Sequence, residues 1–410
     1  MLNIFFFIAL FLSTVLAVPS LFESKRNSIA PLISFSDAKV IPDQFIVKLK
    51  DDVSKDKITT LSDDYPGITH TYEMPGFKGF AGKFSEQVLK EIRQRDDVAF
   101  VETDQQMQTS AVVVQPGEPW GLARISHRAH ILNFVTYSQY AYNPIAGENT
   151  TVYVLDTGIN IKHTDFGGRA RWGITIPAGE PNKDNNGHGT HVAGTIAGFQ
   201  FGVAKRTKVV AVKVFPANGV GPNSDVIKGI EWAVNDHKKT VANAKKKGLI
   251  FKGSVINMSL GGNKSIALDT ATNAAVDAGV PVVVAAGNGI TDACQKSPSG
   301  AEKAIAAGST TQEDSRSWFS NFGCCVDIWA PGSFITSAWI GSKTATMTLS
   351  GTSQSSAHVS GLAAYFLALS AKPLTPHQLR HKLISVATRN LLTDIRACSP
   401  NRLAYNDIGF

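Results

Sequence analysis

The feature that most constrains the fold is a set of apolar runs that recur between residues 150 and 290. Each run is followed by Gly, Asp or Asn and then by a stretch of helical character. The runs span 152–155, 209–215, 255–260 and 280–286. Continuous apolar strands that alternate with helices indicate a parallel sheet covered on both faces. We therefore expect an α/β fold in which helices sandwich a parallel β-sheet, with functional groups just after each run, at the carboxyl ends of the strands.

Residues 41–105 have a different pattern, which predicts a smaller unit. A strand at 45–49 is followed by a polar helix near 54–61, two strands at 70–72 and 79–84, a helix at 85–95 and a strand at 98–101. This order predicts a small α+β layer of the ferredoxin-like, split βαβ type. The periodicity then disappears between 104 and 119, which predicts an exposed linker that a protease could cut.

The first residues resemble a targeting segment. An unbroken apolar stretch at 4–12 leads to Val15-Leu16-Ala17, a small-x-small pattern that signal peptidases cut. We expect residues 1–17 to be a secretory signal. No later stretch has the roughly 18 continuous apolar residues of a membrane helix, so we expect no membrane partner.

Charge is distributed unevenly along the 410 residues. Residues 1–110 hold 12 Lys and Arg against 15 Asp and Glu, whereas the rest hold 28 against 18. Opposite net charges of −3 and +10 favour docking of the two parts on each other. The only basic cluster, Lys245-Lys246-Lys247, is short and is expected at a solvated helix end, so we do not expect nucleic-acid binding.

Four cysteines, Cys294, Cys324, Cys325 and Cys398, lie in the later part of the chain. In an exported protein they can form disulfides. Adjacent Cys324 and Cys325 rarely bond each other because that geometry is strained, so each is expected to have a distant partner or to stay free. The residues alone leave the pairing open.

Two polar residues are candidates for acid–base chemistry. Asp156, in Asp156-Thr157-Gly158, ends the first apolar run. Aspartic proteases use the same triplet, but they need a second copy, which the chain lacks. His188 lies between glycines before a helix of small residues at 192–197. A structural histidine is the alternative, and His188 with His191 could ligate a metal, although no Glu completes an H-E-x-x-H helix.

Ser353 and Asn288 complete the set. Ser353 precedes a long helical stretch at 354–370, where a serine is more often a helix cap. The same position places backbone N–H groups and the positive end of the helix dipole where an oxyanion would form. Asn288 follows the last apolar run and could donate a second oxyanion hydrogen bond, or could simply occupy a turn. Cleaving an amide needs a nucleophile, a base, a group that orients the base, and oxyanion donors. Each role has one candidate here.

The order Asp, His, Asn, Ser resembles the subtilisin-like serine proteases, and most closely the proteinase K and cerevisin group of fungi. The resemblance runs from Pro-Trp-Gly-Leu-Ala-Arg-Ile-Ser at 119–126 to Ser-Pro-Asn-Arg-Leu-Ala-Tyr-Asn at 399–406. It implies an inhibitory pro-domain with its linker at 18–110, which also assists folding, and a peptidase domain at 111–410.

The resemblance also implies roles for individual residues. Asp156 matches the orienting aspartate, His188 the base, Ser353 the nucleophile and Asn288 the oxyanion donor. Two further segments match the strands that pair with an extended substrate, and a third matches the wall of the pocket beside the scissile bond. They are Gly219, Val220 and Gly221; Ser259, Leu260, Gly261 and Gly262; and Ala285, Ala286 and Gly287. Recognition through main-chain hydrogen bonds implies broad sequence tolerance.

The chain departs from the family pattern near the nucleophile. Gln354 replaces a methionine and Ala357 a proline of G-T-S-M-A-x-P-H-V-A-G, and Val192 replaces a cysteine that follows the second histidine in many relatives. Gln354 is expected to lower turnover modestly and to protect against peroxide, because the oxidisable sulfur is gone.

The resemblance suggests two further structural features. Cys294 and Cys325 match a cysteine pair of cerevisin-like members, so a disulfide is expected there, with Cys324 and Cys398 left over. Asp327 matches a calcium-binding aspartate, the alternative being a solvated or capping role. No cofactor is expected to be required, and a structural calcium is the one metal that the resemblance suggests.

Glycosylation sequons begin at Asn149, Asn257 and Asn263. Asn257 lies inside an apolar strand and should be unmodified. Asn149 is in a loop-like segment and is the best glycan candidate.

These expectations describe a secreted, monomeric serine endopeptidase that cleaves proteins and peptides with broad specificity and is made as a self-processed zymogen. Delivery to a vacuole is the alternative location, since both routes begin with the same signal. A non-catalytic relative that only binds peptides is the alternative function, suggested by the altered turn after Ser353. An α/β-hydrolase esterase is excluded by the missing G-x-S-x-G elbow and by a histidine that precedes the serine.

Overall fold

The computed structural model describes residues 29–34, 40–54, 57, 60–61, 64–74, 77–105, 113–117, 119–130 and 139–409. The expected signal at 1–17 and residues 106–112 and 118 of the expected linker lie outside the described residues. The chain divides into two compact units, Met1–Gln108 and Thr109–Phe410.

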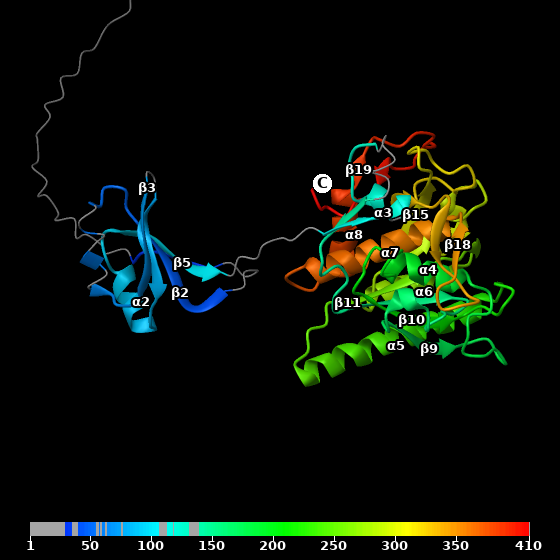
Figure 1. The fold of residues 1–410 in the computed structure, drawn as a ribbon, viewed down its shortest axis with the longest axis horizontal. Coiled ribbons are helices and arrows are strands. Elements are labelled where there is room, and N and C mark those ends of the chain that lie inside the picture. The colour runs from blue at the N-terminus through cyan, green and yellow to red at the C-terminus, as the bar shows by residue number, and fades with distance from the viewer. Residues whose placement is uncertain are drawn as a thin grey trace, which may run out of the picture. The chain divides into compact units, whose positions relative to one another are not determined.

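The first unit is built on a five-stranded sheet (Figure 1). Its strands are β1 (Leu32–Ile33), β2 (Val40–Leu49), β3 (Ile68–Met74), β4 (Phe77–Lys83) and β5 (Val98–Gln105), in the order β1-β5-β2-β4-β3. The last four strands of that order form the expected ferredoxin-like layer. The short edge strand β1, which runs parallel to β5, was not predicted.

Helix α2 (Glu86–Arg93) shows why the sequence forms a helix at this position. The side chain of Ser85 accepts a hydrogen bond from the backbone N–H of Val88 and so caps the helix. Leu89 and Ile92 lie on one face and are buried. They join a core that includes Val47, Phe80 and Val101, so this unit has its own hydrophobic interior.

The second unit contains a nine-stranded sheet. Its strands are β8 (Thr150–Asp156), β9 (Ala170–Thr175), β10 (Lys208–Lys213), β11 (Gly253–Met258), β13 (Val282–Ala285), β15 (Ile305–Thr310), β16 (Ile328–Pro331), β19 (Thr388–Arg389) and β20 (Arg402–Leu403). The order is β19-β20-β16-β15-β13-β11-β8-β10-β9, and only the β19–β20 pair is antiparallel. The four apolar runs form β8, β10, β11 and β13, as predicted.

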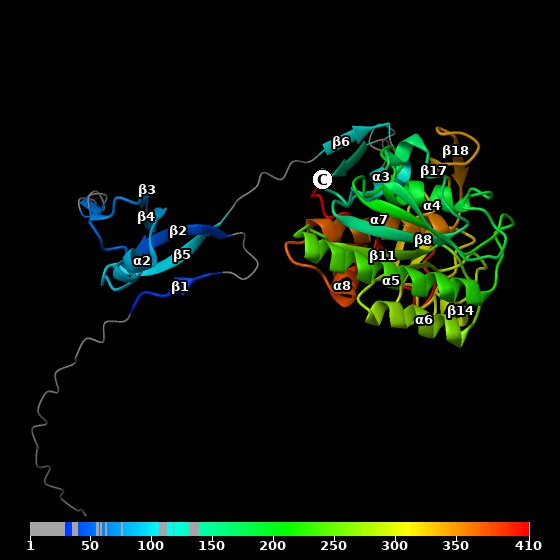
Figure 2. The ribbon, with the colours of Figure 1, turned by 90° about the horizontal axis from the view of Figure 1, so that it is seen from below.

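Helices cover both faces of this sheet (Figure 2). Helices α4 (His188–Ala197) and α7 (Thr352–Leu369) pack on one face, and α5 (Asn223–Lys247) and α6 (Ile266–Asp277) on the other. Nearly all of α7 is buried, and it is rich in Ala and Ser, whose small side chains let neighbouring backbones approach closely. The expected α/β sandwich is therefore present.

One predicted connection differs. No α-helix follows β13; the chain reaches β15 through a 3-10 turn, Ala293–Gln295, and the short strand β14 (Lys296–Ser297). Strand β14 pairs antiparallel with β12 (Gly262–Asn263), which follows β11. The apolar run alone could not reveal this, since the loop that follows is specified by its contacts with β12.

Two disulfides fasten this loop region. Cys294 bonds Cys325, as the resemblance implied, and Cys324 bonds Cys398. The adjacent cysteines thus have different distant partners. The second bond closes a loop of 74 residues and ties the C-terminal tail to the segment before β16.

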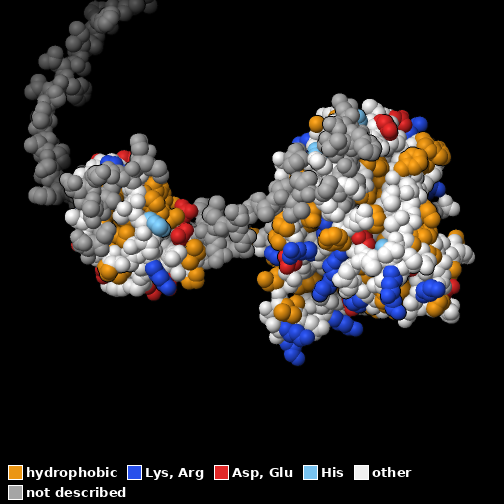
Figure 3. Space-filling view, viewed as in Figure 1, with side chains coloured by type: hydrophobic (Ala, Val, Ile, Leu, Met, Phe, Trp, Pro, Cys, Tyr) orange, Lys and Arg blue, Asp and Glu red, His pale blue; other side chains and the backbone are white. Residues whose placement is uncertain are grey.

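The basic cluster Lys245-Lys246-Lys247 forms the last turn of α5, which Gly248 terminates in a left-handed conformation. The three side chains are exposed, and Figure 3 shows blue side chains at this end of α5. The expected solvated helix end is confirmed. Within the described part of the chain, no helix has both the length and the apolar character needed to cross a membrane.

Candidate active site

The sheet order brings the candidate groups to one edge. Strand β8 lies between β10 and β11, and β13 lies beyond β11. Asp156 is the last residue of β8, Ser259 directly follows β11, and Asn288 follows β13. Because neighbouring strands are parallel, their carboxyl ends meet at the same edge, which is where ligands bind in such sheets.

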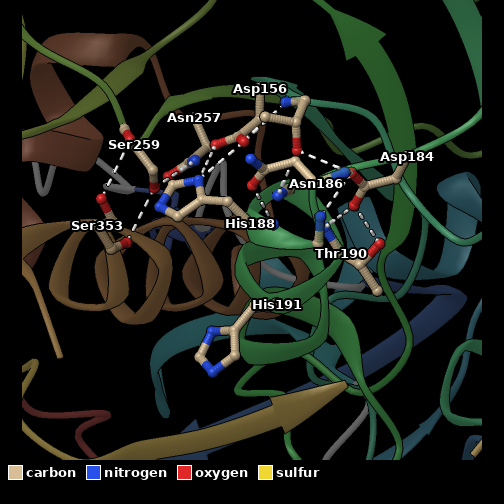
Figure 4. A network of polar contacts seen from close by, with 12 residues as sticks. Asp156, Asp184, Asn186, His188, Thr190, His191, Asn257, Ser259 and Ser353 are labelled. Carbon is tan, nitrogen blue, oxygen red and sulfur yellow. Dashed lines mark hydrogen bonds and ion pairs between the residues drawn. The ribbon is translucent and has the colours of Figure 1, made fainter. Parts of the chain in front are cut away.

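Asp156 and His188 form a hydrogen-bonded pair at this edge (Figure 4). The Nδ1 atom of His188 lies 2.8 Å from Oδ1 and 2.9 Å from Oδ2 of Asp156. The backbone N–H of Thr157 also donates to Oδ1, at 2.7 Å. The carboxylate is 1% exposed and accepts from Nδ1–H, so the second nitrogen, Nε2, carries the free lone pair. In Figure 4 this nitrogen faces the side on which Ser259 and Ser353 lie.

The pKa of His188 is shifted by two opposing effects. Burial alone would lower the pKa, but the charge of Asp156, the hydrogen bond to it and the charge of Asp184 outweigh burial and raise it above the usual value. The imidazolium is therefore stabilised. That is the property a base needs when it must hold a proton during part of a reaction cycle.

Asp184 holds the loop that presents His188, and the sequence reasoning missed it. Its buried carboxylate accepts five hydrogen bonds, from the backbone N–H groups of Asn186, Gly187 and Thr190 and from the hydroxyls of Thr157 and Thr190. One acid thus joins the end of β8 to the first turn of α4. A carboxylate four residues before the histidine was a weak sequence signal, since nothing local shows how many donors converge on it.

Ser353 lies in the first turn of α7, after the N-cap Gly351. Its hydroxyl donates to the carbonyl oxygen of Ser259 at 3.1 Å, and the hydroxyl of Ser259 donates to the carbonyl oxygen of Ser353 at 2.9 Å. These two contacts lock α7 to the end of β11. In this rotamer the hydroxyl is directed to Ser259, so a rotation about the Cα–Cβ bond of Ser353 is needed to turn it toward His188.

Asn288 is oriented by Thr352, the residue before Ser353. Its Oδ1 accepts from the backbone N–H of Thr352 at 2.9 Å and from the hydroxyl of Thr352 at 2.8 Å. With the carbonyl oxygen so occupied, the amide nitrogen Nδ2 is on the opposite side and can act as a donor.

A pocket of about 540 Å³ lies beside Ser353. Most of the predicted substrate residues line it: Ser259, Leu260, Gly261, Gly262, Ala285, Ala286 and Gly287. Gly219, Val220 and Gly221 do not; they occupy the turn between β10 and α5, where Val220 is 71% exposed. The side chain of Asn186 donates to the carbonyl of Ala217 and so connects that turn to the His188 loop.

The metal alternative for His188 and His191 does not fit. Nε2 of His191 contacts the carbonyl oxygens of Ile335 and Met347 at 3.0 and 3.1 Å, and the side chain is completely buried. Burial lowers the pKa of His191 to about 4, so it is a neutral structural group. The amide of buried Gln354 lies 3.3 Å from Nδ1 of His191, so Gln354 fills space between α7 and α4.

The calcium interpretation of Asp327 does not fit either. Its Oδ1 accepts hydrogen bonds from the guanidinium of Arg380 at 2.6 and 3.1 Å, and its Oδ2 accepts the backbone N–H of Ala306. Both oxygens therefore serve an ion pair and a sheet contact. Among the residues that the structure describes, no group of three or more His, Cys, Asp or Glu side chains could hold a metal ion.

Comparisons with known proteins identify the family of this chain. The model of the Subtilase family matches residues 147–401, and that of Peptidase inhibitor I9 matches residues 44–110. The subtilisin-like serine protease Pen ch 18 of Penicillium rubens is 46% identical over 431 residues, covering 96% of this chain and 86% of that protein. Subtilisin-like protease 8 of Trichophyton verrucosum is 44% identical over 430 residues, covering 96% and 87%.

Among solved structures, a cold adapted subtilisin-like serine proteinase matches with a TM-score of 0.63 and 42% identity, covering 71% of this chain and 98% of that one. The chain therefore belongs to the subtilase family: it is a serine protease that carries an I9-type inhibitor domain ahead of its peptidase domain.

Proposed function

We propose that this subtilase is a secreted endopeptidase that attacks peptide bonds with Ser353, using His188 as the base and Asp156 to orient that base. The observation that carries the proposal is the pair of contacts between His188 Nδ1 and the Asp156 carboxylate, 2.8 and 2.9 Å, at the strand edge where Ser353 also lies. The contacts fix the tautomer that leaves Nε2 free to accept a proton.

In the first step, the hydroxyl of Ser353 rotates from the Ser259 carbonyl toward His188. Its oxygen attacks the substrate carbonyl carbon while its proton passes to Nε2 of His188. The carbonyl oxygen becomes an oxyanion, which accepts hydrogen bonds from Nδ2 of Asn288 and from the backbone N–H of Ser353 at the start of α7. The raised pKa of His188 supports the imidazolium of this stage.

In the second step, the imidazolium of His188 donates its proton to the leaving amine, and the C–N bond breaks. The acyl group stays on Ser353. A water molecule then gives a proton to Nε2 of His188, and its oxygen attacks the acyl carbon. The bond between that carbon and Oγ of Ser353 breaks while His188 returns the proton to Oγ, which releases the acid and restores the Ser353 hydroxyl.

We propose that the substrate is read mainly through its backbone. Strands β10 and β11 flank β8, so the segments that follow them, Gly219–Gly221 and Ser259–Gly261, leave the sheet on either side of Asp156. An extended peptide placed between the two segments would pair with main-chain groups on both sides, which imposes few side-chain requirements.

We also propose that the I9 domain blocks the cleft until the chain cuts itself between Asp104 and Pro119, and that the product is secreted with a glycan on Asn149. Asn149 is exposed with a positive φ of 59° in a turn, whereas Asn257 is buried and bonded to the hydroxyls of Ser259 and Ser360. Mass spectrometry of the recovered protein tests the cleavage site and the glycan on Asn149, and the compartment from which the protein is recovered tests its secretion.

The central test is Ser353→Ala. We expect the full-length precursor to accumulate and the product that begins near residue 111 to disappear from an immunoblot. Ser385→Ala, on the exposed face of α8 (Pro376–Val386), is the matched control and should be processed normally.

A second candidate, a peptide-binding protein without catalysis, is favoured by the observed rotamer of Ser353, which is bonded to Ser259. A fluorophosphonate probe separates the two functions. Covalent labelling of Ser353 supports the peptidase, and an unlabelled Ser353 in a folded, processed chain would leave only the binding function.

A further inference from the structure

The pocket beside Ser353 contains one charged side chain. Small and neutral residues, among them Leu260, Ala286 and Gly287, form most of its lining, and Lys296 is its only ionisable residue. The pocket thus combines a volume of about 540 Å³, enough for a side chain, with one positive charge and no negative charge.

Strand pairing places Lys296 at the pocket. In the register of β12 with β14, Lys296 lies opposite Asn263 and Ser297 opposite Gly262. The segment that leads into β12, from Ser259, is itself a pocket wall. Lys296 has intermediate exposure, and Asn263, whose side chain its ammonium group contacts, is exposed, so the positive charge lies at the open rim of the pocket.

The charge of Lys296 has no counter-ion in the described structure. Its Nζ donates to the neutral Oδ1 of Asn263 at 3.1 Å. Neighbouring lysines are different: Lys264 forms an ion pair with Asp269 at 2.9 Å, and Lys303 forms one with Asp277 at 2.6 Å. An ammonium group without a counter-ion at the rim of a pocket attracts the carboxylate of a bound substrate, because charges near a protein surface interact more strongly than charges in bulk water.

We propose that Lys296 makes this pocket selective for an acidic side chain, glutamate above all, on the acyl side of the scissile bond. The inference rests on the proposed peptidase function and deepens it. A substrate carboxylate would replace the neutral amide of Asn263 as acceptor, and a charge-assisted hydrogen bond is about twice as strong as a neutral one. Substrate positions that are read through main-chain hydrogen bonds keep their broad specificity, while a Lys or Arg side chain of the substrate is repelled from this pocket.

The test uses four fluorogenic peptides that are identical except for Glu, Gln, Leu or Lys before the cleaved bond. For the processed enzyme we expect kcat/KM to be about tenfold or more higher for Glu than for Gln, and lowest for Lys. The Glu/Gln ratio should fall as salt is raised, since the interaction is ionic.

Lys296→Met keeps the length of the side chain and removes its charge. The Glu/Gln ratio should fall to about one in this variant, with kcat/KM for Leu maintained or raised. Lys264→Met is the matched control: it removes a lysine that is paired with Asp269 and does not line the pocket, and it should retain the wild-type ratio.

The outcomes separate this inference from the proposed function. If Ser353 is labelled by the fluorophosphonate and the Leu peptide is cleaved, but Glu and Gln are cleaved equally or Lys296→Met leaves their ratio unchanged, the acidic preference is overturned while the peptidase stands. If no peptide is cleaved and Ser353 is not labelled, both fall.

Discussion

Replacing Asp184 by Asn tests whether one buried acid both holds the His188 loop and tunes its base. The wild-type carboxylate accepts five hydrogen bonds. Asn has the same shape but only one acceptor oxygen. If that oxygen keeps the three bonds now made to Oδ1, the new NH₂ group takes the place of Oδ2, and the two bonds that the backbone N–H and the hydroxyl of Thr190 now donate there are lost.

The magnitude follows from that count. Hydrogen bonds to a charged group contribute about 1.5–3 kcal/mol each, so two lost bonds should cost roughly 3–6 kcal/mol of unfolding free energy. For a domain of this size that corresponds to a fall in Tm of roughly 10 °C. Asp184 also helps to raise the pKa of His188, so its neutralisation should lower that pKa. The neutral base then persists to lower pH, and the acid limb of kcat/KM should move to lower pH.

The assay combines two measurements. Melting is followed in a Ser353→Ala background, which prevents self-digestion, and the pH profile of kcat/KM is measured in the active enzyme. Asp277→Asn is the matched control, because it removes only an exposed ion pair with Lys303 and should change stability by no more than about 1 kcal/mol. A variant of Asp184 that melts like the control and keeps the wild-type acid limb would refute the reasoning.

Three further predictions concern the same region. Asn288→Leu should lower kcat about 10²- to 10³-fold with little change in KM, the magnitude known for subtilisin, and a change in KM alone would argue against an oxyanion role. Burial lowers the pKa values of His191 and His358 to about 4, so the unfolded chain binds more protons below about pH 6.5. The contribution of the two neutral histidines to the free energy of unfolding should therefore be complete above that pH, and roughly 3 kcal/mol per histidine should be lost as the pH falls to 4. Urea unfolding of Ser353→Ala at pH 7 and pH 4 would measure this loss, and equal free energies of unfolding at the two pH values would contradict it. Gln354→Met should make activity sensitive to dilute peroxide, whereas rapid loss in the wild type, traced to position 354, would contradict the protective role.

Local pattern was enough to predict the framework of this protein. The four runs that became β8, β10, β11 and β13 are apolar without interruption because both faces of a parallel sheet are buried, and that requirement is written into consecutive residues. The rule that functional groups follow such strands then made Asp156 and Asn288 candidates, and they lie at the carboxyl ends of β8 and β13. The small domain was also predicted from local pattern, through its order of short strands and helices. Its strand β1 was missed, because two residues are too few to show a period.

Tertiary structure decided what depends on distant segments meeting. Nothing near Cys324 specifies Cys398, nothing near Asp184 shows five donors converging on it, and Lys296 faces the pocket only because β14 pairs with β12 where a helix was expected. Hydrophobic periodicity reports how each segment relates to solvent, and so it is visible one stretch at a time. Hydrogen-bond satisfaction and charge pairing are properties of neighbours in space, and the chain reveals those neighbours only when it is folded.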